Sequence, residues 1–415
     1  MATVVLLGTL DTKGREYDYL RERLRAEGVD VVLVDAGVYE PLAEADIAQA
    51  EVAAAAGEDV GALAEAADRG RAVDAMGRGA AEVVRRLHQE GRLDGILAVG
   101  GSGNSSIAGQ AMRVLPVGVP KLIVSTLASG DTRPYVGASD VTMTYSVVDI
   151  SGLNRISERI LANAAGAIAG MAKVQVEEKA GRPLIGATMF GVTTPAVTRA
   201  RERLEELGYE VLVFHATGTG GQSMEALARG GFLAGVLDLT TTELCDDLVG
   251  GVLSAGPDRL EAAGELGLPQ VVSVGALDMV NFGPRETVPE QFEGRNLYVH
   301  NPTVTLMRTT PEECAELGRR IARKLSAATG PTALFVPLKG VSMIATEGGV
   351  FHDAAADEAL FSALREGLGD NVELHELDLD VNDPAFADAM ADRLHAMLEA
   401  QAAKPPAPGR ERGLS

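Results

Sequence analysis

The sequence predicts an α/β protein of two Rossmann-like domains, each a mostly parallel sheet flanked by helices. The first observation is that short apolar runs, typical of strands buried on both faces, alternate with amphipathic helical segments. The second is that residues 183–217 repeat the order and nearly the spacing of residues 3–35. This repetition indicates that the two domains are related by internal duplication.

The first domain opens with a strand–helix–strand unit. TVVLLG at 3–8 is a strand, TLDTKG at 9–14 is a polar turn, and the helix that follows ends at Gly28. VDVVLVD, ending at Asp35, is the next strand. Residues 42–90 are Ala-rich and favour helix, and a long helix within 148–174 closes this half.

The second half repeats this plan. The strand, turn, helix and strand of 183–217 are followed by GVLDLTTTEL and PQVVSVGALD, which match the GILAVGGSGN and PKLIVSTLASGD segments of the first half. We therefore expect a nucleotide-binding domain at 1–180 and a second domain at 181–400. The Pro-rich segment 401–415 is expected to be a disordered tail.

Composition excludes several function classes. The 415 residues carry 37 Lys and Arg against 59 Asp and Glu, a formal net charge of −22, and no cluster of basic residues. Because nucleic-acid binding depends on clustered cations, we expect no nucleic-acid partner. No apolar run approaches a membrane span and the N-terminus lacks a basic leader, so we expect no membrane association. The two cysteines form no CxxC pair, which fits a cytoplasmic protein.

The stretch GGSGNSSIAG, beginning at Gly100, lies between a predicted strand and a predicted helix. Glycine permits close approach of a ligand to the backbone, and Ser105 and Ser106 stand where the helix would begin. Free amides and hydroxyls at a helix start make a phosphate-binding site. The alternative is a tight strand-to-helix turn with no ligand.

Two neighbouring strand ends strengthen the first interpretation. One offers the cation Lys13, and Asp11 and Asp131 are candidate Mg²⁺ ligands. The predicted nucleotide-binding residues are Asp11, Thr12, Lys13, Asp35, Gly100, Gly101, Ser102, Gly103, Asn104, Ser105, Thr126, Ser129, Gly130 and Asp131.

Two motifs that the sequence lacks narrow the choice of nucleotide. The third glycine of G-x-G-x-x-G is replaced by Ser106, and no acid ends the following strand, so NAD is disfavoured. The P-loop pattern G-x-x-x-x-G-K-[ST] is also absent. Asp35 is placed to reach a ribose hydroxyl, or else is a solvated acid in a turn.

Predicted strand ends and loops of the second half carry three of the six histidines, among them His215 and His300. Glu243 and Asp278 follow two further strands. Converging His and acid side chains suit general acid–base work, so these four residues are the candidate catalytic set. The alternatives are a metal site, which no local ligand spacing supports, and hydrogen-bonded structural residues.

With these residues in view, the chain resembles an ATP-binding family of largely uncharacterised bacterial, archaeal and fungal proteins. That family also includes the inhibitor domain of a plant tobamovirus-resistance protein. The resemblance covers about residues 1–400 and is carried by GTLDTKG, GGSGN, PVGVPKLIVSTLASGD, YSVVDISGLN, GATMFGVTTPAV, HATGTGGQSME, LDLTTTEL, SAGPDRLEAA, PQVVSVGALDMVNFG and HNPTVTLMRTT. It implies two Rossmann-like domains, a homodimer, and bound ATP with Mg²⁺.

Two functions remain open at this stage. The first is an ATP-dependent ligase, phosphotransferase or hydrolase that acts on an unidentified small molecule at the cleft between the domains. The second is a non-catalytic ATP-sensing module that binds a partner protein. A third reading, a sugar-phosphate site that takes ATP only incidentally, uses the same glycine loop.

Overall fold

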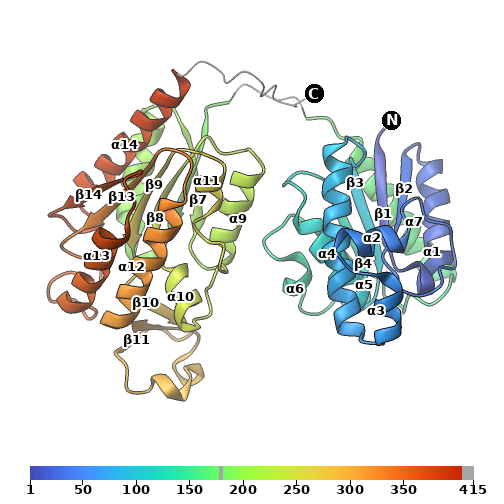
Figure 1. Cartoon of the computed structure of the whole chain (residues 1–415), viewed down its shortest axis with the longest axis horizontal. Coiled ribbons are helices and arrows are strands. Elements are labelled where there is room, and N and C mark those ends of the chain that lie inside the picture. The colour runs from blue at the N-terminus through green and yellow to red at the C-terminus, as the bar shows by residue number, and fades with distance from the viewer. Residues whose placement is uncertain (177–180, 404–415) are drawn as a thin grey trace. The chain divides into compact units, whose positions relative to one another are not determined.

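The structure is a computed structural model that describes residues 1–176 and 181–403. The chain divides into two units, residues 1–179 and 180–415, which Figure 1 shows in blue to green and in green to red. Each unit is an α/β domain with a parallel sheet at its core, as the alternating pattern predicts.

The N-terminal unit is built on a five-stranded parallel sheet of order β2-β1-β3-β4-β5. Its elements are β1 (Thr3–Gly8), α1 (Leu10–Ala26), β2 (Asp30–Asp35), α2 (Gln49–Ala55), α3 (Val60–Ala66), α4 (Arg69–Gln89), β3 (Gly95–Gly100), α5 (Ser102–Arg113), β4 (Lys121–Ser125), α6 (Arg133–Val136), β5 (Thr142–Tyr145) and α7 (Arg155–Ala172).

Helices cover both faces of this sheet, which is why its central strands read as continuous apolar runs. α1 and α7 pack on one face through Leu20, Leu24, Leu161 and Ile168. α2, α4 and α5 pack on the other face (Figure 1). Both faces of β1 and β3 are consequently buried.

The C-terminal unit has a six-stranded parallel sheet of order β14-β13-β9-β8-β6-β7 and a three-stranded antiparallel sheet of order β10-β12-β11. Its strands are β6 (Leu184–Met189), β7 (Glu210–His215), β8 (Gly235–Thr240), β9 (Gln270–Gly275), β10 (Met279–Phe282), β11 (Leu297–Asn301), β12 (Val304–Arg308), β13 (Thr332–Pro337) and β14 (Val372–Leu377). Its α-helices are α8 (Thr194–Glu206), α9 (Thr219–Arg229), α10 (Glu243–Val249), α11 (Ala262–Glu265), α12 (Pro311–Ser326), α13 (Ala354–Gly367) and α14 (Pro384–Ala402).

The strand orders of the two units correspond. β6, β7, β8 and β9 take the places in the second sheet that β1, β2, β3 and β4 take in the first. This agreement is what an internal duplication predicts. The small antiparallel sheet and β14 have no counterpart in the first unit, and the sequence pattern did not predict the antiparallel sheet.

Three predicted boundaries were wrong. α1 begins at Leu10, so the expected turn 9–14 is mostly helical, with a non-helical backbone at Lys13. α5 begins at Ser102 with Gly101 as its N-cap, three residues before the predicted start at Ser105. α14 continues to Ala402, so the expected tail cannot begin at 401, and residues 404–415 lie outside the described residues.

Candidate functional site

A cavity of about 430 Å³ lies in the N-terminal unit beyond the carboxyl ends of β1, β2 and β3. β1 and β3 are neighbours in the sheet, and the strands that follow them along the chain, β2 and β4, lie on opposite sides of this pair. Ligands of open parallel sheets bind at such a topological switch point. The cavity is lined by Thr9, Asp11, Thr12, Lys13, Ala36, Gly37, Val38, Tyr39, Leu63, Ala67, Asp68, Arg69, Ala72, Val73, Met76, Gly100, Gly101, Gly103, Asn104, Ile107 and Asp149.

The start of α5 forms one wall of the cavity. Gly101 is its N-cap and brings no side chain, and no side chain among the described residues accepts from the amides of the first turn. At Gly100 a Cβ would lie 2.8 Å from the Cβ of Asn104, so any side chain there would push against the first turn. The N-terminus of α5 therefore borders the cavity with a glycine as its cap, and its partial positive charge favours an anion.

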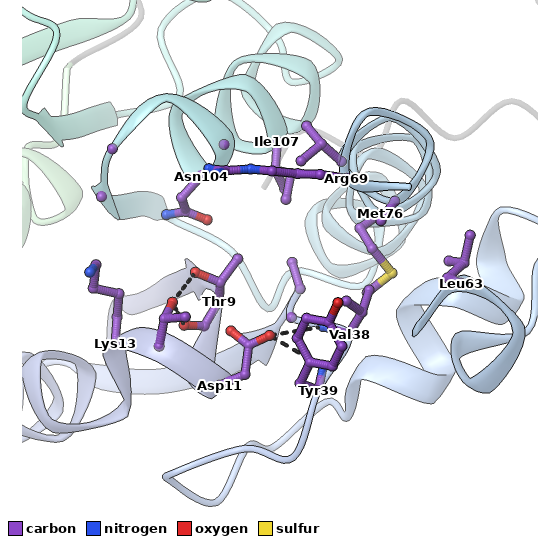
Figure 2. A pocket seen from close by; sticks show the side chains of 18 of the residues that line it. Thr9, Asp11, Lys13, Val38, Tyr39, Leu63, Arg69, Met76, Asn104 and Ile107 are labelled. Atoms are coloured by element: carbon purple, nitrogen blue, oxygen red, sulfur yellow. Dashed lines mark hydrogen bonds between the residues drawn. The ribbon is translucent and has the colours of Figure 1, made fainter. Parts of the chain in front are cut away.

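Two cations flank this helix start. Lys13 comes from the kink in α1, and Arg69 is the first residue of α4. Within the described ranges, neither residue forms a hydrogen bond through its side chain or an ion pair. A terminal nitrogen of Arg69 lies 3.4 Å from the position a Gly103 Cβ would occupy, and Figure 2 shows the guanidinium extending toward Asn104. The amides and both cations thus border the same cavity.

The far side of the cavity is apolar. Leu63 of α3, Met76 of α4 and Ile107 of α5 line it, and Tyr39 lies in the loop after β2 (Figure 2). Leu63, Met76 and Ile107 are at most 2 % exposed. A charged end and an apolar end in one cavity suit a ligand that carries both phosphate and a flat, weakly polar group.

The Asn104 side chain is held in place by a hydrogen bond to Tyr17. The Tyr17 hydroxyl, buried under β1, accepts from Asn104 Nδ2 (3.1 Å) and from the Val99 amide (2.9 Å), and it donates to the Leu7 carbonyl (2.6 Å). Burial raises the pKa of Tyr17 well above its usual range, so the hydroxyl stays protonated. A Cβ on Gly8 would overlap the Tyr17 ring, so this arrangement requires glycine as the last residue of β1.

Several predicted residues do not line this cavity. Asp35 is 1 % exposed, and its Oδ1 accepts from the amides of Leu10 (3.0 Å) and Gly37 (2.8 Å), so it orders the loops rather than facing a ribose. Burial raises the pKa of Asp35, an effect that these two amides oppose. Ser105 shares a hydrogen bond with the Ser125 hydroxyl (2.8 Å) inside the domain. The other predicted residues absent from the lining are Ser102, Thr126, Ser129, Gly130 and Asp131.

Only one of the two candidate magnesium ligands, Asp11 and Asp131, lines the cavity. Asp131 lies in the exposed loop after β4, where both carboxylate oxygens accept from Arg133, which lowers the pKa of Asp131 to about 2. Asp11 lines the cavity, but its Oδ2 accepts from the amides of Val38 and Tyr39, both at 3.2 Å. Among the residues that the structure describes, no three His, Cys, Asp or Glu side chains gather as a metal site.

The four predicted catalytic residues are not linked to one another by any hydrogen bond or ion pair within the described ranges. His215 is the exposed last residue of the edge strand β7, and its ring lies 5.4 Å from that of Phe190. His300 is the exposed next-to-last residue of β11 in the antiparallel sheet, and its catalytic role stays a prediction.

The two acids of this set are buried. Glu243 accepts from the amides of Gly218 (2.7 Å) and Gly221 (3.0 Å) and pairs with Arg259 at 2.6 Å. Asp278 accepts from the Ser342 hydroxyl (2.7 Å), and burial raises the pKa of Asp278 to about 6. Both are 0 % exposed, so neither is open to a substrate in this structure.

The position in the C-terminal unit that corresponds to the glycine loop is closed by threonines. At the end of β8, Thr240 shares a hydrogen bond with the Thr193 hydroxyl (2.7 Å) and donates to the Thr188 carbonyl (3.1 Å). The next residue, Thr241, donates to the Ser273 carbonyl (3.0 Å). The second unit fills with its own side chains the place that the first unit leaves open.

Comparison with known proteins assigns the chain to a family. Residues 2–177 match the N-terminal domain, and residues 182–398 the C-terminal domain, of the Uncharacterised protein family (UPF0261). The chain belongs to the UPF0261 family.

Its relatives within UPF0261 include bacterial proteins of similar length. A UPF0261 protein of Clostridium tetani is 56 % identical over 95 % of this chain and 99 % of its own length. One from Rhizobium meliloti is 51 % identical over 94 % of this chain and 97 % of its own. The tomato ToMV resistance protein Tm-1(GCR237) is 41 % identical over 94 % of this chain, which spans 55 % of that protein.

Sequence reasoning missed part of the cavity of this UPF0261 chain. Arg69, Leu63 and Met76 come from helices in the Ala-rich segment, which carries no motif. Their local signals are Asp59 and Asp68, typical N-cap residues whose carboxylates accept from the amides of Ala62 and Arg71. None of the described helices of this UPF0261 chain is long and apolar enough to cross a membrane.

Proposed function

We propose that the N-terminal unit of this chain binds ATP, with the phosphates at the start of α5 and the base against the apolar wall. The observation that carries the proposal is the uncapped N-terminus of α5, which opens into a cavity flanked by Lys13 and Arg69. In a chain of net charge −22, a polyphosphate needs such local devices, because the overall field repels it.

The apolar wall separates this proposal from a site for inorganic phosphate or a sugar phosphate alone. Leu63, Met76 and Ile107 offer no hydrogen-bonding groups, and they suit the face of a base. The proposed ligand therefore carries phosphate at one end, a ring at the other end and a linker between them.

We propose that Mg²⁺ is held through the nucleotide and not by a set of protein ligands. Asp131 is paired with Arg133 outside the cavity, and Asp11 keeps only one oxygen free of hydrogen bonds. Protein-bound Mg²⁺ commonly keeps several waters and uses the phosphates of its substrate as ligands. The metal of Mg-ATP would have to be held in that way here.

Replacing Lys13, the cation at the kink of α1, tests whether phosphate binds at this end of the cavity. We expect Lys13→Ala to weaken ATP binding about tenfold or more, since a charge-assisted hydrogen bond to phosphate is lost. Isothermal titration of the full chain with ATP, ADP, AMP and pyrophosphate measures this, and the loss should be larger for ATP than for AMP.

The matched control is Arg15→Ala, which removes one positive charge from the exposed face of the same helix. It should leave the ATP affinity within about twofold, because exposed charges are screened by salt. Equal losses in both variants, or no ATP binding by the unaltered chain, would overturn the proposal.

Binding without turnover is the role that we propose, so the module responds to ATP and acts through a partner protein. The two acids of the predicted catalytic set offer no support for the competing role of an ATP-dependent enzyme, because Glu243 and Asp278 are both 0 % exposed and Glu243 is paired with Arg259. Release of ADP, AMP or phosphate from Mg-ATP in the presence of a metabolite mixture would decide for the enzyme. The homodimer stays a prediction that light scattering checks.

A further inference from the structure

Two hydrogen-bond acceptors at the cavity lack donors. Asn104 Oδ1 and Asp11 Oδ1 are both buried and have no hydrogen-bond partner among the described residues. A buried polar atom left without a partner costs about 1–3 kcal/mol. These two atoms therefore mark places where a ligand that brings donors would gain binding energy.

The direction of the Asn104 amide is fixed by its neighbours. Nδ2 donates to the Val99 carbonyl (2.9 Å), which can only accept, and to the Tyr17 hydroxyl (3.1 Å). Turning the amide over would place Oδ1 against the Val99 carbonyl. The side chain is 5 % exposed and lines the cavity, so Oδ1 is presented as an acceptor and not as a donor.

Asp11 is fixed in a similar way. Its Oδ2 accepts from the amides of Val38 and Tyr39, and Gly37 packs so closely that a Cβ there would lie 2.8–3.0 Å from the carboxylate. The loop after β2 thus holds the carboxylate in one orientation. Figure 2 shows Asp11 and Asn104 facing the same open space from opposite sides.

Phosphate cannot satisfy these acceptors. A fully ionised phosphate carries no donor, and its oxygens are repelled by the carboxylate of Asp11. The part of the ligand that meets them must be uncharged and carry O–H or N–H groups. Figure 2 shows Asp11 between Lys13, at the proposed phosphate end, and Val38 and Tyr39 of the loop after β2, where a sugar would follow the phosphates.

We infer that Asp11 and Asn104 form a hydroxyl-recognition subsite, which selects ribonucleotides over deoxyribonucleotides. This inference rests on the proposed nucleotide function and deepens it. It also gives Asp11 the ribose role that the sequence assigned to Asp35, which is 1 % exposed and does not line the cavity.

The test compares ATP with 2′-deoxy-ATP and 3′-deoxy-ATP by isothermal titration of the full chain. We expect at least one deoxynucleotide to bind the unaltered protein about tenfold or more weakly, because an acceptor is then left without its donor. In Asp11→Asn the amide oxygen can keep the contacts with Val38 and Tyr39, so Nδ2 replaces the free acceptor with a donor. The preference for ATP should then fall to about twofold or less.

The matched control is Asp18→Asn, on the exposed face of the same helix, which should keep the full preference. Equal affinity for all three nucleotides in the unaltered protein would overturn the inference while leaving ATP binding intact. An Asp11→Asn loss that is the same for all three nucleotides, or that vanishes in EDTA, would assign Asp11 to another role and also overturn it. No binding of any nucleotide would refute the proposed function itself.

Discussion

Replacing Arg259 with methionine is expected to destabilise the C-terminal unit by about 3–5 kcal/mol, the usual cost of leaving buried charge without its partner. Arg259 is 1 % exposed. Its guanidinium pairs in two places with Asp238 (2.5 and 2.7 Å) and through Nε with Glu243 (2.6 Å), and Glu225 lies 3.7 Å away.

The electrostatics of this cluster explain the size of the effect. Burial by itself would lower the pKa of Arg259, but the three carboxylates raise it well above its usual range. Burial raises the pKa of Glu225, and the charge of Arg259 opposes that shift. Without the arginine, three buried acids face one another, and they must take up protons or water must enter.

Hydrogen exchange of the full chain, followed by mass spectrometry, measures the effect unit by unit. Faster exchange should be confined to residues of the second unit around β8 and α9. The control Arg229→Met removes an arginine that is 44 % exposed and lies 3.7 Å from Glu225 and Glu265, and it should cost less than about 1 kcal/mol. Similar protection in the two variants would contradict this account of the cluster.

The second large effect is expected at Asp246, where Asp246→Asn should stabilise the protein increasingly as the pH rises. Asp246 is 1 % exposed, and its carboxylate accepts from the Asn281 side chain (2.7 Å) and backbone amide (3.0 Å), with no cation partner in the part of the chain that the structure describes. Burial raises the pKa of Asp246 to about 7, an effect that the Asn281 hydrogen bonds oppose.

The sign follows from proton linkage. An unfolded aspartate has a pKa near 3.9, so between about pH 4 and pH 7 the folded chain binds more protons at this site than the unfolded chain. This carboxyl therefore favours folding at low pH, and its contribution is lost as the pH rises through 7. From pH 5 to pH 8 the variant should gain roughly 2–3 kcal/mol relative to the original chain.

The variant can keep its hydrogen bonds. Asn281 Oδ1 has no donor at present, so a rotated Asn281 amide can accept from the new Nδ2 at position 246. Urea unfolding of both chains at several pH values, followed by circular dichroism, measures the difference. A stability difference that does not change between pH 5 and pH 8 would contradict the raised pKa of Asp246.

The parallel sheets were predictable from the sequence because each buried strand is a local apolar run, as at 3–8 and 95–100. The half of the cavity that we propose for phosphate was predictable for a similar reason. Gly100 ends one such strand, Gly101 and Gly103 follow it, and Lys13 comes shortly after another, and strand ends of a parallel sheet share one edge.

The other half of the cavity lining depends on contacts between segments that are distant in the sequence. Asp11 lines the cavity and Asp35 does not, although one oxygen of each carboxylate accepts from two backbone amides, and no spacing rule gives that difference. Arg69 reaches Gly103 across thirty-four positions of chain, and its own segment resembles any exposed helix start. The pairing of Glu243 with Arg259 could not be predicted for the same reason, because the two residues come together only in the folded domain.

The glycine that ends β1 makes the cavity sensitive to a residue that does not line it. Any larger side chain at position 8 would displace the aromatic ring of Tyr17, and with it the hydroxyl that orients the Asn104 amide. A substitution at Gly8 would thus alter the ligand preference of the proposed site, and would not only lower the stability of the domain. Efforts to retune what this domain recognises should therefore treat Gly8, Tyr17 and Asn104 as a single unit of design.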